Sequence, residues 1–114
     1  MAAEQTTVVL ADDHNVIRAG LRAMLEAEED LRVIGEAADA AAAAKLVADR
    51  RPDVLVLDLQ MPGADPRRDI ADLRESTPGT AIVVLTMQND PRGARDLLRA
   101  GAAGYVLKRR RRGS

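Results

Sequence analysis

The sequence contains no cysteine, tryptophan or phenylalanine, and Tyr105 is its only aromatic residue. The lack of cysteine excludes disulfide bonds and thiolate metal sites, and it is compatible with a reducing compartment. No apolar run approaches the ~20 residues that a membrane-spanning helix needs, and the N-terminus lacks the apolar core of a signal peptide. We therefore expect a cytoplasmic protein with no membrane contact and a core of aliphatic side chains and alanine.

The 114 residues suit one compact domain, because a chain of this size buries roughly two-thirds of its unfolded surface. Charge is spread unevenly along the chain. Residues 1–107 hold all 18 acidic residues and 12 of the 17 basic ones, and five basic residues follow at 108–112. We interpret the acidic body and the basic tail as separate features.

Short apolar runs alternate with helical patterns along the chain. The longer runs show no period-two alternation, as expected of parallel strands that are covered on both faces. Asp39, Asp65 and Asp90 are candidate N-caps of helices, and Gly101 is a candidate helix end. The runs occupy residues 8–11, 33–34, 54–57, 81–85 and 105–107, and helical patterns begin at 15, 40, 66 and 91. This order predicts an α/β fold, a doubly wound parallel sheet of five strands with right-handed crossovers.

Polar residues stand where the predicted strands end, which is where such sheets bind ligands. In VLVLDLQMPG, residues 54–63, four apolar residues lead directly into a carboxylate. We interpret the apolar run as a rigid mount that delivers this aspartate to the edge of the sheet. The polar residues at the strand ends are Asp12 and Asp13, Asp58, Thr86 and Lys108.

The chemistry of these groups predicts phosphoryl transfer. Three carboxylates held close together repel one another, and a hard divalent cation such as Mg²⁺ would relieve the repulsion. Lys108 adds an ammonium group and Thr86 adds a hydroxyl. A carboxylate nucleophile with Mg²⁺, an ammonium and a hydroxyl indicates a site that forms an aspartyl phosphate.

Several stretches in order carry a resemblance to a known family: VVLADDHNVIRAGLRAML, VLVLDLQMPG, VVLTMQND and RAGAAGYVLK. Over about residues 7–108, the sequence resembles the receiver domain of bacterial two-component response regulators. The ADDH opening and the AGAAGYVLK ending are most similar to the branch whose receivers precede a LuxR/NarL-type helix-turn-helix. The resemblance implies a flavodoxin-like strand order, 2-1-3-4-5.

The same resemblance implies which residues act in phosphorylation. Asp58 would accept a phosphoryl group from a sensor histidine kinase. Asp13, Asp58 and the backbone carbonyl of Gln60 would hold Mg²⁺, and Asp12 would act mainly through a metal-bound water.

Further roles follow from the family pattern at the other strand ends. Thr86 and Lys108 would bind phosphoryl oxygens, and Tyr105 would change rotamer as Thr86 moves toward the phosphate. Gln60 and Gln88 lie two positions beyond the acceptor and the threonine. They would tune how fast the phosphoryl group is hydrolysed by controlling the approach of water.

Each of these residues also has a simpler interpretation. An aspartate after a strand often only forms a turn, Thr86 could be an ordinary strand residue, and Lys108 could be solvated. Their joint placement favours the functional interpretation, whereas for Tyr105 simple packing is equally favoured. We interpret His14, at the start of the first predicted helix, as a solvated or capping residue.

The end of the sequence departs from the family pattern. Receivers of this type continue into a fifth helix, whereas only RRRRGS follows Lys108, so a strip of the sheet about one helix wide would be left uncovered. Three explanations account for this: a fragment with a vector-derived Gly-Ser end, a homodimer that closes the strip, or a short protein that docks a partner there. The receiver domain would then span residues 1–108 and the basic tail residues 109–114. The four arginines at 109–112 indicate nucleic-acid binding only weakly, because no aromatic residue interleaves them.

A second departure lies after MPG, where Ala64-Asp65-Pro66 stands in place of the usual glycine and stiffens the loop. We interpret the chain as a phosphorylation-dependent switch, not an enzyme beyond its own phosphorylation and dephosphorylation. Its helix 4 and strand 5 face would control transcription through a DNA-binding domain absent from this chain. The alternative is a receiver-like interaction module that works without phosphorylation. A phosphohydrolase of the haloacid-dehalogenase type is disfavoured, because it needs an acid at position 60 and this position holds glutamine.

Overall fold

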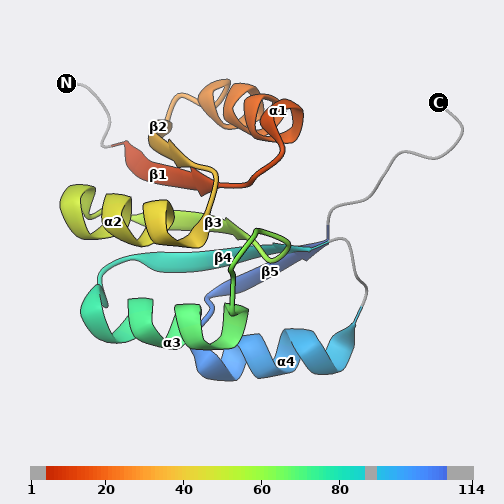
Figure 1. The fold of residues 1–114 in the computed structure, drawn as a ribbon. Helices are drawn as coiled ribbons and strands as arrows, with labels where there is room; N and C mark the ends of the chain where they lie inside the picture. The colour runs from red at the N-terminus through yellow and green to blue at the C-terminus, as the bar shows by residue number, and fades with distance from the viewer. Residues whose placement is uncertain (1–4, 87–89, 108–114) are drawn as a thin grey trace, which may run out of the picture.

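The computed structural model describes residues 5–86 and 90–107, in which five strands alternate with four helices (Figure 1). The elements are β1 (Thr6–Ala11), α1 (Asn15–Glu26), β2 (Leu31–Ala37), α2 (Ala40–Arg50), β3 (Val54–Asp58), α3 (Pro66–Ser76), β4 (Ala81–Thr86), α4 (Pro91–Ala100) and β5 (Gly104–Leu107). All neighbouring strands run parallel, in the order β2-β1-β3-β4-β5. The predicted fold and strand order are therefore confirmed.

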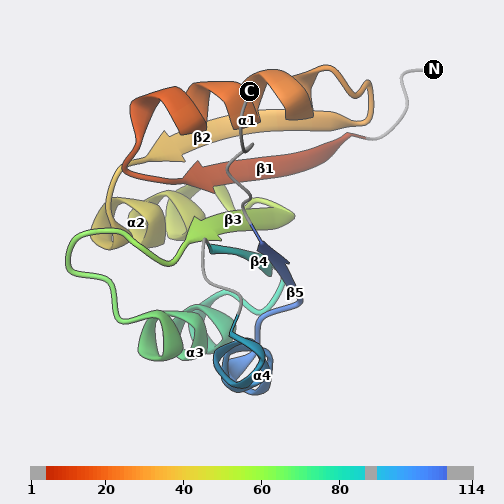
Figure 2. The same ribbon diagram turned by 90° about the vertical axis from the view of Figure 1, so that its right-hand side faces the viewer.

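The sheet separates two apolar clusters, one under each layer of helices. Alternate residues of a strand face opposite sides. Val9 and Ala11 of β1 belong to the larger cluster, which includes residues of α2, α3 and α4. Val8 and Leu10 belong to the smaller cluster, against which Leu21 and Leu25 of α1 pack. Helix α1 accordingly lies on one face of the sheet, and the other three helices lie together on the opposite face (Figures 1 and 2).

The α1 face has the thinner cover. None of the residues of α1, all of which are described, is buried. Met24 lies at helical spacing from Ile17 and Leu21, a pattern that predicts this helix, yet its side chain is 70% exposed. The spacing therefore locates the helix but does not identify every buried side chain. The predictions of a missing fifth helix and a basic tail concern residues 108–114 and lie outside the described residues. Within the described ranges, no helix combines the length and apolar character needed to cross a membrane.

The predicted helix ends are confirmed in position but only partly in mechanism. Asp39 caps α2 by accepting a hydrogen bond of 2.8 Å from the backbone N–H of Ala42. Asp65 and Asp90 occupy the N-cap positions of α3 and α4, yet neither side chain makes a capping hydrogen bond among the described residues. Both helices begin with proline, whose fixed φ favours the first helical turn without such a bond. Gly101 ends α4 with a φ of 126°, a conformation that favours glycine.

Candidate functional site

Two neighbouring strands bring the acidic residues together. Ala11 at the end of β1 pairs in register with Leu57 of β3, so Asp12 and Asp58 occupy the next position on each strand. Both side chains are only 1% exposed, although they lie at the end of the sheet. The buried strands therefore fix the positions of both aspartates, side by side at the carboxyl edge of the sheet.

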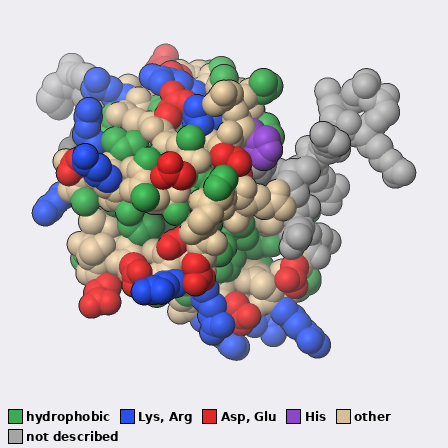
Figure 3. All heavy atoms as spheres, in the orientation of Figure 1, with side chains coloured by type: hydrophobic (Ala, Val, Ile, Leu, Met, Phe, Trp, Pro, Cys, Tyr) green, Lys and Arg blue, Asp and Glu red, His purple; other side chains and the backbone are tan. Residues whose placement is uncertain are grey.

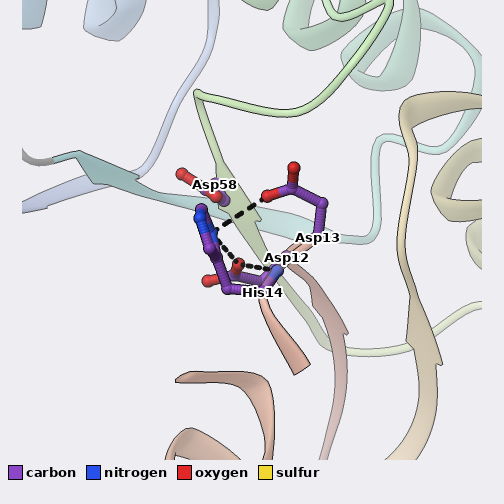
Figure 4. A group of neighbouring side chains, drawn as sticks. All are labelled: Asp12, Asp13, His14 and Asp58. Carbon is purple, nitrogen blue, oxygen red and sulfur yellow. Dashed lines mark hydrogen bonds and ion pairs between the residues drawn. The ribbon is translucent and has the colours of Figure 1, made fainter. Parts of the chain in front are cut away.

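Asp13 and His14 complete a cluster with these two aspartates (Figure 4). One potential ligand atom from each of the four residues lies within 4.8 Å of the other three. The side chain of Asp13 is 28% exposed and that of His14 is 56% exposed. The cluster thus has a buried floor formed by two carboxylates and a more accessible rim formed by Asp13 and His14.

Backbone amides of the following loops hold the two buried carboxylates. Asp12 Oδ1 accepts a hydrogen bond of 2.9 Å from the backbone N–H of His14. Asp58 Oδ1 accepts one of 3.1 Å from the backbone N–H of Gln60. Each aspartate bonds to the backbone two residues ahead, a local turn that orients the carboxylate at the start of its loop.

Arg18 of α1 supports the first of these loops. Its Nη1 donates a hydrogen bond of 2.6 Å to the backbone carbonyl of Asp12, and its Nε donates one of 2.9 Å to Glu36 Oε1. Glu36 of β2 also pairs with Arg22. Burial acts to raise the pKa of Glu36, but the hydrogen bonds from Arg22 and Arg18 outweigh it, so this pKa lies below its ordinary value. Arg18 was not among the predicted site residues, and its helical spacing from Arg22 was the only signal for it in the sequence.

His14 was interpreted as a solvated or capping residue, and the structure agrees with the first of these two alternatives. It occupies the N-cap position of α1, but its side chain makes no capping hydrogen bond to the described residues. It is half exposed, and its Nδ1 lies 3.1 Å from Asp13 Oδ1 and 3.4 Å from Asp12 Oδ1. The imidazole is therefore solvated and does not cap the helix, and it is also turned toward the carboxylates. Its position directly after two aspartates was the signal that could have indicated this.

The structure places Thr86 and Tyr105 on adjacent strands. Thr86 ends β4 and is 2% exposed, and Tyr105 of β5 packs partly buried against the larger cluster. Val84 pairs in register with Tyr105, and Thr86 lies two residues further along the strand, so all three share one face of the sheet. Gln60 is exposed beyond Asp58. Lys108 and Gln88, predicted as site residues, lie outside the described residues.

The donor set of the cluster fits a divalent cation. Carboxylate oxygens are the ligands that hard cations prefer, and imidazole nitrogen suits borderline metals. Asp13 Oδ1 is a buried atom that accepts no hydrogen bond from any described residue. An ion with ligands at about 2.1 Å holds opposite ligands about 4.2 Å apart, so the observed spread approaches one coordination sphere. These residues could therefore hold a metal ion if the distances between their ligand atoms shortened slightly.

Comparisons with known proteins agree with this arrangement. The family model described as the response regulator receiver domain matches residues 8–113. The chain is 43% identical over 102 residues to the oxygen regulatory protein NreC of Staphylococcus epidermidis, covering 89% of this chain and 47% of NreC. It is 39% identical over 101 residues to the uncharacterized transcriptional regulatory protein YhcZ of Bacillus subtilis, with the same two shares covered. The chain spans about half the length of these curated relatives.

Solved structures show the same fold. The signal receiver domain of the response regulator NarL from Mycobacterium tuberculosis superposes with a TM-score of 0.89 at 35% identity, covering 96% of this chain and 89% of that one. The isolated receiver domain of RcsB from Salmonella enterica, with the phosphomimetic BeF3⁻, gives a TM-score of 0.86 at 34% identity, covering 92% and 78%.

Proposed function

The chain belongs to the response regulator receiver domain family, and on that premise we propose that it is a phosphorylation-dependent signalling switch with Asp58 as its phosphoacceptor. The observation that carries the proposal is the convergence of Asp12, Asp13 and Asp58, whose ligand atoms lie within 4.8 Å of one another. Carboxylates gathered this closely gain from an external cation, and such a cation is also what a transferred phosphoryl group requires.

Asp13, Asp58 and the Gln60 backbone carbonyl would hold Mg²⁺, with Asp12 acting through a water molecule. When bound, Mg²⁺ would supply positive charge that offsets the repulsion between the carboxylates and the phosphoryl oxygens. The hydrogen bond from the Gln60 N–H to Asp58 Oδ1 keeps this carboxylate oriented toward the cluster. The chain's part in metal binding is therefore to preorganise the oxygen donors.

Asp58 receives the phosphoryl group by nucleophilic attack. One of its carboxylate oxygens forms the new O–P bond, while the N–P bond to the histidine of the partner kinase breaks and its imidazole leaves. In this proposal, the hydroxyl of Thr86 and the ammonium of Lys108 bind oxygens of the transferred group. Positioning and charge neutralisation account for most of the catalysis in such transfers.

The switch operates through the α4–β5 face. The transferred dianion attracts Thr86, and the movement of Thr86 favours one rotamer of Tyr105, which shares its sheet face. Phosphorylation then shifts a two-state equilibrium that already exists, and about 3 kcal/mol of difference corresponds to about 150-fold.

Gln60 and Gln88 set the lifetime of the phosphorylated state by controlling how water approaches it. The exposed position of Gln60 beyond Asp58 supports this role for one of the two residues. Gln60→Ala and Gln88→Ala should each change the half-life of the phosphorylated protein. If both variants retain the wild-type half-life, this part of the proposal is wrong.

The output is transcriptional and requires a DNA-binding domain outside this chain. In support, YhcZ is named a transcriptional regulatory protein, and a related RcsB structure is described as bound to the promoter rprA. Residues 1–108 act as the receiver, in the cytoplasm, and residues 109–114 form a basic tail. A homodimer of this chain is tested by the mass measured in size-exclusion chromatography.

Acetyl phosphate with Mg²⁺, followed by intact-mass measurement, tests the acceptor. The wild-type chain should gain one phosphoryl group, and Asp58→Asn should gain none. Asp53→Asn is the matched control, because Asp53 directly precedes strand β3 at its amino end and Asp58 is the last residue of this strand. The control should be phosphorylated like the wild type.

Three other results would overturn the proposal in different ways. A wild-type chain that gains no mass supports the alternative interaction module. Continuous turnover of acetyl phosphate without a modified intermediate indicates a hydrolase. A mass gain that persists in Asp58→Asn places the acceptor elsewhere.

A further inference from the structure

We propose that the imidazole of His14 is an additional ligand of the metal site, which raises its affinity for Co²⁺ and Zn²⁺ relative to Mg²⁺. This inference rests on the proposed function, because it concerns the same metal site. It assigns to this chain a metal preference that an oxygen-only cluster would lack.

The position of the ring supports this role. His14 Nδ1 lies 3.1 Å from Asp13 Oδ1 and 3.4 Å from Asp12 Oδ1, and the cluster extends to Asp58 within 4.8 Å. The ring and the carboxylates turn toward one another in Figure 4. A nitrogen and three carboxylates thus surround one small region at the carboxyl end of the sheet.

Among the described residues, the imidazole pairs with the carboxylates of Asp13 and Asp12. The side chain does not cap α1, although His14 stands at its N-cap position and all residues of the first turn are described. Nδ1 lies 3.1 Å from Asp13 Oδ1, an ion-pair distance when the ring is protonated, and this buried oxygen accepts no hydrogen bond from the described residues. The backbone N–H of His14 does bond to Asp12 Oδ1, which fixes the ring's starting point beside the cluster.

The ring also stands where an ion could reach it. The side chain of His14 is 56% exposed, and the purple imidazole is visible at the surface near acidic side chains in Figure 3. An exposed ring can change its rotamer at little cost. The ligand atoms can therefore move closer to an ion through the side chains of His14 and Asp13, without any movement of the buried strands.

The expected selectivity follows from the donor atoms. Mg²⁺ prefers oxygen and keeps several waters, so it gains little from a nitrogen donor. Co²⁺ and Zn²⁺ bind more tightly than Mg²⁺ to mixed sites, and imidazole is among their preferred ligands. A fourth donor from His14 should therefore strengthen the binding of these ions and leave Mg²⁺ binding nearly unchanged.

Isothermal titration of the untagged full chain with Co²⁺ and with Mg²⁺ tests the selectivity. His14→Asn should weaken Co²⁺ binding about tenfold or more, because losing a direct ligand should cost at least as much as losing a group that only orients ligands, with Mg²⁺ affinity changing less than about twofold. Asparagine is a suitable replacement because it is itself a favoured N-cap residue, which protects the start of α1. Asp13→Asn serves as the reference variant and should weaken the binding of both ions.

Nuclear magnetic resonance of the ring gives an independent readout. The chain has a single histidine, so both imidazole ¹⁵N signals belong to His14, and only Nδ1 and Nε2 must be told apart. Zn²⁺ should shift the Nδ1 signal strongly, as direct coordination requires, whereas Mg²⁺ should leave it near its original position.

Equal effects of His14→Asn on both ions, or no effect on either, would overturn the inference, as would an Nδ1 signal that Zn²⁺ does not shift. The same preparation is treated with acetyl phosphate and Mg²⁺. If the wild type is phosphorylated and the His14 result is negative, only this inference fails. If the wild type is not phosphorylated, the proposed function fails separately.

Discussion

The aspartates at the two ends of the sheet have different neighbours. At the amino end, Asp53 Oδ2 accepts hydrogen bonds from the backbone N–H and the hydroxyl of Thr7, at 2.8 and 3.0 Å. The Thr7 hydroxyl in turn accepts a bond of 3.0 Å from the Asp53 N–H. Nearby, the buried Thr80 hydroxyl donates a bond of 2.7 Å to the Pro52 carbonyl. Polar groups here bind one another and join β1 to the start of β3.

At the carboxyl end of the sheet, several carboxylates lie close to one another. Asp12 and Asp58 are both 1% exposed and belong with Asp13 to one cluster. Like charges held together destabilise the folded state unless a cation joins them. Asp53 therefore stands apart from other carboxylates and links two strands, whereas Asp12 and Asp58, which also accept backbone hydrogen bonds, lie close enough to Asp13 to share a cation.

The largest expected difference between the two ends is in metal affinity. Asp13→Asn should lower Mg²⁺ affinity by about 100-fold, at the upper end of the losses seen when groups supporting a metal site are removed. Its stability without metal should not fall, because the change removes one of three repelling charges. Asp53→Asn should retain wild-type Mg²⁺ affinity. Calorimetric titration of both variants with Mg²⁺ checks this. Equal losses of Mg²⁺ affinity would contradict the assignment of metal binding to the carboxyl end alone.

A smaller effect is expected from Arg18, which contacts the cluster only through the Asp12 carbonyl. Arg18→Ala should lower Mg²⁺ affinity about tenfold, as expected of a positioning residue behind a metal site. Arg22→Ala is the matched control, because Arg22 pairs with Glu26 and Glu36 and makes no described contact with the cluster. If the control weakens Mg²⁺ binding as much, then Arg18 acts only by stabilising α1 against β2.

At the amino end, Thr7→Val should lower the free energy of unfolding by about 1 kcal/mol, because it removes a hydroxyl that both donates to and accepts from Asp53. Mg²⁺ affinity should stay at the wild-type value. Urea unfolding monitored by circular dichroism measures the first quantity and calorimetry the second. A change in Mg²⁺ affinity would show that the two ends of the sheet are coupled.

The smallest effect is the pH dependence of the same contact. Hydrogen bonds from the backbone and side chain of Thr7 hold the pKa of Asp53 below its ordinary value of 3.8. A lowered folded-state pKa means that the contact stabilises fully above the unfolded-state pKa and is lost as pH falls through the folded-state pKa. The stability difference between wild type and Asp53→Asn should therefore shrink as pH falls below 3.8. A difference that stays constant in urea titrations across this range would contradict the assignment.

The order of elements and the meeting of Asp12 with Asp58 could be predicted from the sequence. Uninterrupted apolar runs of four or five residues indicate parallel strands buried on both faces, and parallel strands end at a common edge. Once the strands were recognised, the residues directly after them had to lie close together. These predictions needed only local sequence patterns, because strand formation and burial follow from composition and spacing.

Other features depended on pairings that only the tertiary structure decided. Asp53 meets Thr7 across 46 residues of sequence, and Arg18 reaches a backbone carbonyl that has no sequence signature. His14 turned out to face the carboxylates, and Met24 turned out to face solvent. Apolar spacing determines which elements form and which strand ends meet, whereas the direction of an individual side chain depends on its rotamer and on neighbours that are distant in the chain.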